Sequence, residues 1–261
     1  MRIVSWNVNG LRAVIKKGAL DRVDSEDLAA ICLQETRCDL GTEDAVMVKM
    51  HSSWHRGYWA TGTAGRSGTA IFTRGPSSLA PRRSAALYDE DTGEGRVTSV
   101  LIETKRPFVL MSCYAPNTGR EHRSREKHDW MQRLTGEVCW LQREHYPVIL
   151  CGDWNAILDP EDVHDFKGTS GTPGNYDFER DDLFDTIDSA SLVDAWRTRN
   201  PEARRYTYWD YRTAARRRGL GWRIDSFLVD ECIFCSVSDA QIHDTIEGSD
   251  HCPISINISE E

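Results

Sequence analysis

The sequence predicts an α/β fold in which two mixed β-sheets pack face to face, with helices on the outside. Short runs rich in valine, isoleucine and aromatic residues recur along the chain, bounded by glycine, proline or aspartate. The runs 96–103 and 108–114 follow each other closely, which is typical of an antiparallel hairpin. Helical segments separate other runs, so the pattern favours mixed sheets over a purely parallel, alternating sheet.

The predicted elements follow from these patterns in chain order. The runs predicted as strands are 2–6, 30–34, 68–73, 96–103, 108–114, 147–151, 222–229, 237–243 and 253–258. Helices are predicted at 19–30, 124–144 and 181–191. The second is the clearest, because Trp130, Leu134, Val138 and Leu141 recur at a helical period. Segment 159–175 contains glycine and proline without periodicity, which predicts a long surface loop.

The composition is that of one globular domain spanning residues 1–261, because no linker divides the 261 residues. No apolar stretch approaches the roughly 18–20 residues that cross a bilayer, so no membrane partner is expected. The first residues enter a strand-like run without a signal-peptide core, which favours an intracellular protein of cytoplasm or nucleus. Cysteines within apolar runs, such as Cys32 and Cys151, indicate buried free thiols. Cys232 and Cys235 form a single CxxC motif, and no second cysteine pair follows at the spacing of a zinc site.

The charge is unevenly distributed. A net charge of −9 argues against a general nucleic-acid binder. Between Arg197 and Arg223, however, nine arginines face only Glu202 and Asp210, a local balance of +7. This segment either meets a phosphate backbone on one face or forms a solvated arginine-rich loop. The sequence alone leaves both interpretations open.

Polar side chains stand where several apolar runs end. Glu35 follows run 30–34, and Asp153 and Asn155 follow run 147–151. Further oxygen donors and one imidazole are Asn7, Asn9, Asp250 and His251. If these runs end at one edge of the sheets, their side chains share a cleft that suits a hard divalent cation and a water aimed at a phosphodiester.

More specific roles are expected for several of these residues and for Asp225. Asp153 can accept a proton or orient a water, and the Asn155 amide can donate to an oxyanion. His251 can serve as a base or as a phosphate-binding cation. Asp225 is a lone carboxylate in an apolar run and therefore needs a partner, so we predict that it holds His251 in position. Turns and surface positions are the ordinary alternative for such residues.

Six segments together carry a resemblance to a known family. They are Ser5–Ala13, Leu33–Thr36, Cys113–Asn117, Gly152–Asn155, Trp222–Asp225 and Gly248–Pro253. In this order they resemble the motifs of the exonuclease III family, the class II apurinic/apyrimidinic (AP) endonucleases of the endonuclease/exonuclease/phosphatase superfamily. The resemblance runs from residue 2 to about residue 258 and implies a four-layer α/β sandwich.

The resemblance also implies roles for individual residues. Implied metal ligands are Glu35, Asn9 and Asp250, with Mg²⁺ as the ion and Mn²⁺ as a substitute. Implied catalytic groups are Asp153, which orients or deprotonates the attacking water, and Asn155, His251, Asp225, Tyr114 and Asn7. Implied substrate-binding groups are Asn117, Arg120, Tyr208, Arg212, Trp222 and Ile224. Of these, Tyr208, Trp222 and Ile224 would line the pocket for a flipped-out abasic sugar.

This chain departs from the family at informative positions. Relatives can carry Asp at position 9, so Asn9 makes the site one charge less negative. Arg212 stands where eukaryotic relatives insert an apolar side chain into the duplex. Arg66 replaces an aromatic residue that often precedes the Ser-Gly pair. The loop 156–178 lacks the family's usual pattern, so no site residue is assigned there.

The implied function is a monomeric, Mg²⁺-dependent repair enzyme acting on double-stranded DNA with abasic sites. It would cut 5′ to the abasic site, leaving a 3′-hydroxyl and a 5′-deoxyribose phosphate, with 3′-phosphodiesterase and 3′→5′ exonuclease side activities. One alternative is a non-specific DNase or another superfamily phosphoesterase, acting on phosphoinositides or sphingomyelin. Another is a nucleic-acid-binding relative without catalysis, which the filled catalytic positions disfavour.

Overall fold

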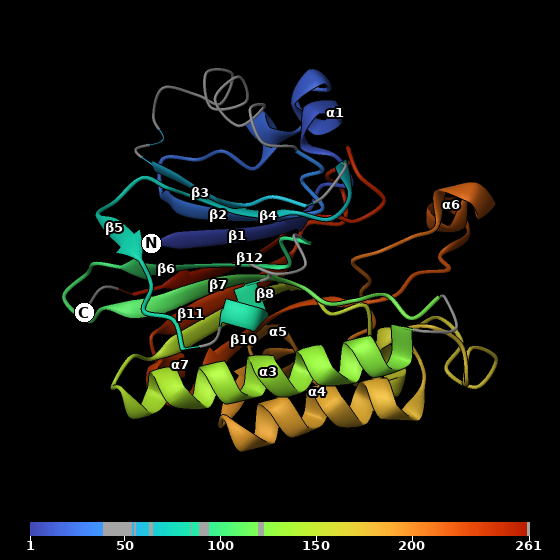
Figure 1. The fold of residues 1–261 in the computed structure, drawn as a ribbon. Coiled ribbons are helices and arrows are strands. Elements are labelled where there is room, and N and C mark those ends of the chain that lie inside the picture. The colour runs from blue at the N-terminus through green and yellow to red at the C-terminus, as the bar shows by residue number, and fades with distance from the viewer. Residues whose placement is uncertain are drawn as a thin grey trace.

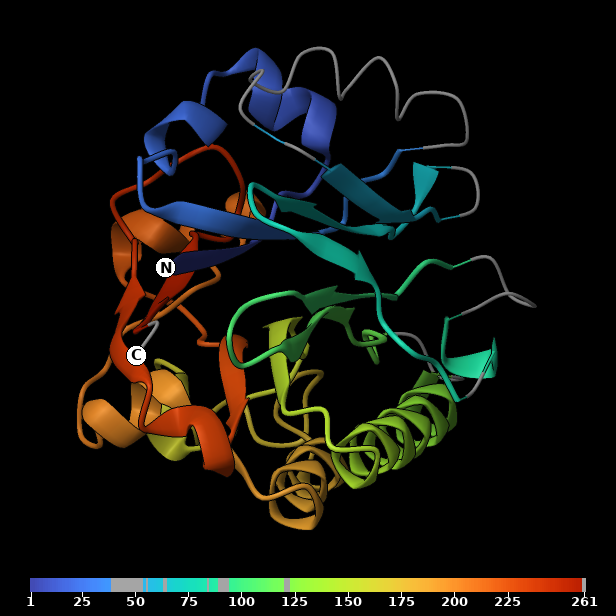
Figure 2. The same cartoon turned by 90° about the vertical axis from the view of Figure 1, so that its left-hand side faces the viewer.

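Two six-stranded mixed sheets face each other in the computed structural model (Figures 1 and 2). The structure describes residues 1–38, 54, 56–62, 65–83, 85–88, 94–119 and 123–259. The first sheet has the order β11-β12-β1-β2-β4-β3, and the second has the order β5-β6-β7-β8-β10-β9. This architecture confirms the predicted fold class.

The first sheet consists of β1 (Arg2–Asn7), β2 (Leu28–Gln34), β3 (Arg56–Ala60), β4 (Thr69–Thr73), β11 (Val237–Ile242) and β12 (Ile254–Ile258). The second consists of β5 (Ser77–Leu79), β6 (Val97–Ile102), β7 (Phe108–Tyr114), β8 (Val148–Asp153), β9 (Leu192–Asp194) and β10 (Asp225–Asp230). Within each sheet one central pair is parallel, β1 with β2 and β7 with β8, and the other neighbours are antiparallel.

Helices form the outer layers. In the described ranges the α-helices are α1 (Leu11–Lys16), α3 (Arg123–Arg143), α4 (Asp177–Ser189), α5 (Ala195–Arg199), α6 (Ala215–Arg218) and α7 (Glu231–Phe234). Short 3₁₀ turns are η1 (Leu20–Arg22), η3 (Ala85–Tyr88), η4 (Pro160–Asp162) and η5 (Tyr211–Thr213). Helix α1 lies over the first sheet, α3 and α4 cover the second, and α6 projects from the body (Figure 1). No helix in the described ranges has the length and apolar character to span a bilayer.

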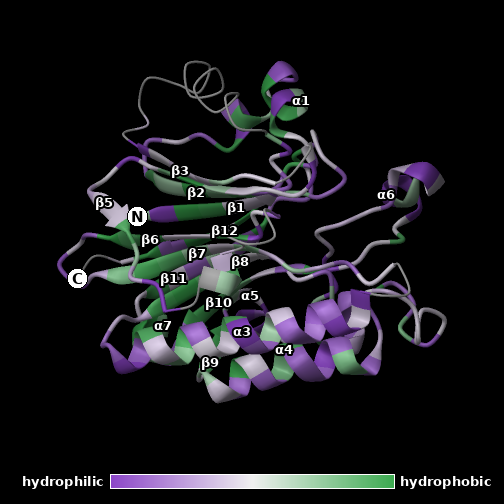
Figure 3. Cartoon of the chain, viewed as in Figure 1, coloured by the Kyte–Doolittle hydropathy of each residue, from purple (hydrophilic) through white to green (hydrophobic). Residues whose placement is uncertain are grey.

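Both faces of the central strands are buried, which explains why their sequences are continuously apolar. Successive residues point to opposite faces: Ile3 packs between the sheets, whereas Val4 packs toward α1. In the second sheet Leu110 faces the inter-sheet core and Met111 packs under α3 with Trp130. The hydropathy colouring shows the same division, with apolar strands between helices whose outer faces are polar (Figure 3).

Most predicted elements are present, and one is wrong. The hairpin of β6 and β7, the helix α3 and the helix α4 lie where the sequence placed them, within a few residues. The helix predicted at 19–30 is absent: only η1 is helical there, and Leu28 already begins β2. The parallel pairing of Leu28 with Arg2 of β1 overrides the local helical pattern. The cysteines within the described ranges are free, and Cys32 and Cys151 are buried as predicted.

Candidate active site

One edge of the sandwich collects the predicted catalytic side chains. The carboxyl ends of β1, β2, β7 and β8 lead to this edge. Strand β10 begins there because it is antiparallel to β8, which places Asp225 opposite Asp153. Strand β12 is antiparallel to β1, with Ile254 opposite Ser5, so His251 just before it also reaches this edge. Strand polarity thus brings together residues from both ends of the chain.

Asp153 is the buried centre of this cluster. Its Oδ2 accepts a hydrogen bond from Asn7 Nδ2 at 2.8 Å, and its Oδ1 accepts one from the Asn155 backbone N–H at 2.8 Å. Burial raises the pKa of Asp153 to about 7; His251 opposes this shift and Asp225 adds to it. A carboxylate that titrates near neutral pH is suited to exchange a proton with water.

His251 lies between two carboxylates. Its Nδ1 is 2.8 Å from Asp225 Oδ2, and its Nε2 is 3.8 Å from Asp153 Oδ2. Burial lowers the pKa of His251, but Asp225 and Asp153 outweigh it and raise the pKa to about 10. The imidazole is therefore cationic at neutral pH. The predicted contact between Asp225 and His251 is confirmed.

Glu35 sits just after β2 in a left-handed backbone conformation, with φ of 49°. Its Oε1 accepts hydrogen bonds from Tyr114 Oη at 2.9 Å and from Asn7 Nδ2 at 3.2 Å. Its Oε2 accepts from Arg37 Nη2 at 2.5 Å and Nε at 3.2 Å. Burial raises the pKa of Glu35, but the bonds from Arg37 and Asn7 more than compensate and lower it, so the carboxylate is ionised.

Asn9 and Asp250 form a second part of the cluster. Asn9 Nδ2 donates to Asp250 Oδ1 at 2.8 Å, and the Asn9 backbone N–H donates to Asn7 Oδ1 at 3.1 Å. Asn9 has a φ of 46°, again left-handed. Asn7 therefore links the three residues predicted as metal ligands, because it also donates to Glu35.

Asn155 bonds to partners on several sides. Its backbone has a φ of 48°. The side-chain Nδ2 donates to the Ala115 carbonyl at 2.9 Å, and Oδ1 accepts from Asn117 Nδ2 at 2.9 Å. The backbone carbonyl accepts from Lys127 Nζ at 2.7 Å. Lys127 is a contact that the motifs did not indicate.

An aromatic surface adjoins His251. The predicted sugar-binding residues Tyr208, Trp222 and Ile224 belong to one apolar cluster with Ile157. The Tyr208 and His251 rings lie 4.8 Å apart between centroids. Tyr208 and Trp222 are half-buried, whereas Ile224 is buried beneath them. Apolar surface is thus available directly beside the cluster around Asp153 and His251.

The remaining predicted substrate contacts lie further out. Asn117 is exposed beside Asn155. Arg212 is exposed on η5, which immediately precedes α6 in the chain. Arg120 lies outside the described residues.

The arginine-rich segment divides into structural and exposed members. Arg223 is buried and bonds to Asp162 at 2.7 and 2.8 Å and to Asp194 at 2.8 Å. Arg197 pairs with Asp162 too. Arg216 lies over the Trp209 ring, 4.5 Å from its centroid. Arg212, Arg217 and Arg218 remain exposed. Part of the local positive charge is therefore neutralised within the fold. Sequence reasoning did not predict which arginines are buried and which are exposed.

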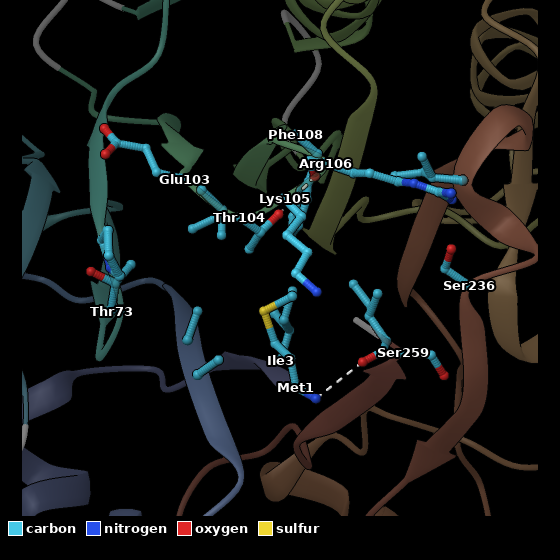
Figure 4. Close-up of a pocket in the computed structure, with 17 residues that line it drawn as sticks. Met1, Ile3, Thr73, Glu103, Thr104, Lys105, Arg106, Phe108, Ser236 and Ser259 are labelled. Carbon is cyan, nitrogen blue, oxygen red and sulfur yellow. Dashed lines mark hydrogen bonds between the residues drawn. The ribbon is translucent and has the colours of Figure 1, made fainter. Parts of the chain in front are cut away.

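Two hollows differ in their relation to the cluster. One of about 390 Å³ adjoins Glu35, Tyr114 and Asn117 and is also lined by the arginines Arg37, Arg66, Arg96 and Arg123. Another of about 280 Å³ opens between the sheets at the opposite end, where Ile3 and Phe108 lie (Figure 4). Of these two hollows, only the first is lined by predicted site residues.

The donor chemistry of the cluster fits a hard divalent cation. Oxygen atoms of Asp153 and Asp225 and a nitrogen of His251 lie within 4.8 Å of one another. Because the imidazole of His251 is cationic, only the two carboxylates of this group can offer ligand atoms to a cation. The carboxylates of Glu35 and Asp250 join this group through Asn7 and Asn9, so oxygen donors dominate. Oxygen-rich sets suit Mg²⁺ or Mn²⁺ better than softer metals.

Comparison with known proteins agrees with this geometry. A model of the Endonuclease/Exonuclease/phosphatase family matches residues 4–251. The exodeoxyribonuclease of Bacillus subtilis is 36% identical, and the alignment covers 99% of this chain and 100% of that protein. DNA repair nuclease APEX1 of Danio rerio is 34% identical over 98% of this chain and 81% of that protein.

A solved structure of the 3′ phosphatase NExo from Neisseria, bound to a product DNA hairpin, superposes with a TM-score of 0.88. It is 25% identical, and 99% of each chain is covered. These similarities confirm the resemblance to exonuclease III and the class II AP endonucleases. This chain belongs to the endonuclease/exonuclease/phosphatase family.

Proposed function

We propose that this protein is a Mg²⁺-dependent DNA-repair endonuclease that hydrolyses the phosphodiester 5′ to an abasic site. The chain is a phosphodiester-hydrolysing nuclease of a divalent-metal-dependent family, and its relatives include a DNA repair nuclease. The observation that carries the proposal is the adjacency of the cluster around Asp153 and His251 to the apolar surface of Tyr208 and Trp222.

The metal would be held by Glu35, with Asn9 and Asp250. Glu35 supplies an ionised carboxylate, and Asn9 fixes the orientation of Asp250 through their 2.8 Å hydrogen bond. When bound, the cation offsets negative charge on the phosphoryl oxygens. Arg37 neutralises Glu35 in the structure and would have to share this carboxylate with the cation.

The proton chemistry falls to Asp153. Asn7 and the Asn155 N–H fix both carboxylate oxygens, so the group is oriented before substrate arrives. Its pKa of about 7 lets it accept a proton from the attacking water. The cationic His251, held by Asp225, is placed to donate a hydrogen bond to a phosphoryl oxygen. Asn117 would donate its second amide N–H at the rim, and the Tyr114 hydroxyl would have to exchange its bond to Glu35 for one to the phosphate.

The specificity for abasic sites would come from the surface of Tyr208, Trp222 and Ile224. A nucleotide without a base loses little stacking when it leaves the duplex, so an apolar slot selects it at low energetic cost. Exposed Arg212, Arg217 and Arg218 would contact phosphates around it. Arg120 remains a proposed contact of the same kind.

Side activities at 3′ ends are part of the proposal. One similar protein is named exodeoxyribonuclease, and a similar structure is a 3′ phosphatase. We therefore propose 3′-phosphodiesterase and 3′→5′ exonuclease activity from the same residues. We further propose that residues 1–261 form a single catalytic domain that acts as a monomer.

An incision assay tests the proposal. A duplex oligonucleotide with one abasic site is incubated with the protein in Mg²⁺, in Mn²⁺ and in EDTA, and the product ends are identified. We expect cleavage with either metal, loss of cleavage in EDTA and with Glu35→Ala, and a 3′-hydroxyl next to a 5′-deoxyribose phosphate. A cut that persists in EDTA, or a β-elimination product, would contradict the mechanism.

The same assay separates the alternatives. Equal turnover of intact and abasic duplexes would indicate a non-specific DNase. Turnover of inositol phosphates without turnover of DNA would indicate another superfamily phosphoesterase. Tight binding of abasic DNA without turnover in Mg²⁺ would indicate a binding protein.

A further inference from the structure

A lysine is buried behind the catalytic cluster. The side chain of Lys127, on α3, is 1% exposed, and its Nζ donates to the Asn155 carbonyl at 2.7 Å and to Glu179 Oε1 at 2.9 Å. Buried lysines are rare unless they are paired, so the surrounding structure must supply specific partners. Here one partner is a carboxylate from α4 and the other is the backbone of a predicted catalytic residue.

Glu179 holds this lysine with a carboxylate whose two oxygens each accept two hydrogen bonds. Its Oε1 also accepts from Thr118 Oγ1 at 2.7 Å. Its Oε2 accepts from the backbone N–H groups of Gly174 at 2.7 Å and Tyr176 at 3.2 Å. The network therefore ties α3, α4 and the loop before α4 to one point, and the Lys127 ammonium has little freedom to move.

Asn155 transmits this contact to the reacting groups. Its carbonyl accepts from Lys127, and its N–H donates to Asp153 Oδ1 at 2.8 Å. Its side chain accepts from Asn117. The left-handed φ of 48° is uncommon for a residue other than glycine and requires support from neighbours.

We propose that Lys127 is a positioning residue for catalysis: by anchoring the Asn155 carbonyl, it holds the Asn155 N–H on Asp153 and the Asn155 side chain on Asn117. Lys127 is too deeply buried to contact DNA, so it acts through Asn155 alone. The inference deepens the proposed phosphodiester hydrolysis and rests on it.

The test compares two variants that break the same ion pair from opposite sides. Lys127→Met keeps an unbranched side chain of similar length but cannot donate to Asn155. Glu179→Gln removes the opposite charge and leaves Lys127 able to donate to Asn155. We expect kcat on abasic duplex to fall ~100-fold in Lys127→Met, the size of effect expected from a small misplacement of reacting groups, with little change in KM. Glu179→Gln is expected to lower kcat by less than Lys127→Met does, because Lys127 can still donate to the Asn155 carbonyl.

The double variant Lys127→Met/Glu179→Gln separates positioning from folding. It contains no unpaired buried charge, so its melting temperature should recover relative to Lys127→Met, while kcat should remain low. A control for the packing of α3 on α4 is His128→Ala, which removes the 2.7 Å contact to Asp182 without touching Asn155. Its kcat should equal that of wild type. All rates are compared at a temperature where circular dichroism shows each variant folded.

Two results would overturn the inference. One is a wild-type kcat in folded Lys127→Met, and the other is a double variant whose kcat recovers together with its melting temperature. Hydrolysis of bis(p-nitrophenyl) phosphate is measured in parallel. If wild type cleaves this diester but not abasic DNA, the proposed substrate is wrong, while the comparison of Lys127 variants on the diester still decides the inference.

Discussion

The strands that end at the proposed catalytic cluster begin at the opposite end of the sandwich, beside a hollow of different character. Strand β1 runs from Arg2, beside the hollow, to Asn7 in the cluster, and β7 runs from Phe108 to Tyr114. The hollow has apolar walls that include Ile3, Ile102 and Phe108, with Lys105 reaching over it toward Met1 (Figure 4). The cluster end carries convergent carboxylates, carboxamides and an imidazole.

The backbone differs between the two ends as well. Asn9, Glu35, Arg37 and Asn155 have positive φ at the cluster end, whereas no residue that lines the hollow does. Left-handed backbone at non-glycine residues is unfavourable and is maintained where surrounding contacts determine it. In this molecule the proposed catalytic site is therefore distinguished by convergent polar groups on constrained backbone rather than by the size of a hollow.

The largest expected effect comes from the centre of the cluster. Asp153→Asn removes the group that accepts the proton, so we expect kcat on abasic duplex to fall roughly 10²–10⁴-fold. The folded pKa of Asp153 lies above the usual value. The folded protein therefore loses stability as pH rises from that usual value to about 7, because Asp153 must ionise in a buried site. The variant should therefore melt at or above the wild-type temperature at pH 8. Calorimetry measures the melting temperature and the incision assay measures kcat. A variant that is both active and destabilised would contradict the assignment of Asp153 as the group that accepts the proton.

A second change tests the support of His251. Asp225→Ala removes the buried carboxylate that lies 2.8 Å from His251, and we expect about a 10²-fold loss of activity, the size of effect expected when one donor to a charged oxygen is lost. Loss of one partner from a buried pair also costs about 3–5 kcal/mol of stability. Asp225→Asn keeps the shape and a hydrogen-bonding group, so it should lose less stability. Wild-type rates from folded Asp225→Ala would show that the pair has no catalytic role.

The hollow end should respond in the opposite way. Ile3 is fully buried at the start of β1, so Ile3→Ala should lower the free energy of unfolding by about 2–5 kcal/mol. Asn7 lies four residues further along the strand, at the cluster, and keeps its own bonds to Glu35 and Asp153. The folded variant should therefore keep the wild-type kcat. Urea unfolding and the incision assay, run on the same sample, measure both quantities, and a lower kcat in folded protein would mean that the two ends are coupled.

Sequence reasoning found the cluster end because polar residues interrupt apolar runs at strand ends. Glu35, Asp153 and His251 stand out for this reason, and the lone carboxylate of Asp225 in an apolar run correctly indicated its partner. The helix expected at 19–30 failed because pairing with β1 decides where Leu28 lies, and such a pairing is not encoded in local periodicity.

Sequence reasoning missed other buried residues because charged side chains are normally expected on the surface. Lys127 precedes Trp130 by three positions and so lies on the apolar face of α3, a signal that the helical period could have supplied. Arg223 and Arg197 were counted with a basic segment, yet they bond to Asp162 in the interior. No local pattern distinguishes these two arginines from the exposed Arg217, because the distinction depends on acidic partners distant in sequence.

The smallest expected effect concerns the strand surface between the two ends. His243 lies beside Arg2, with its Nε2 3.3 Å from Arg2 Nη2 and 2.8 Å from Ser255 Oγ. Burial and Arg2 lower the pKa of His243 to about 4. The unfolded chain, whose histidine titrates at its ordinary value, therefore binds more protons in the window between that value and about 4. Stability contributed by neutral His243 is present above the ordinary value and is lost as pH falls toward about 4.

His243→Gln should flatten this part of the curve of melting temperature against pH without changing kcat at pH 7.5. An unchanged slope in the variant would show that the burial of neutral His243 does not cause this loss of stability. Asp153 could not replace it as the cause, because its raised folded pKa makes the protein more stable as pH falls.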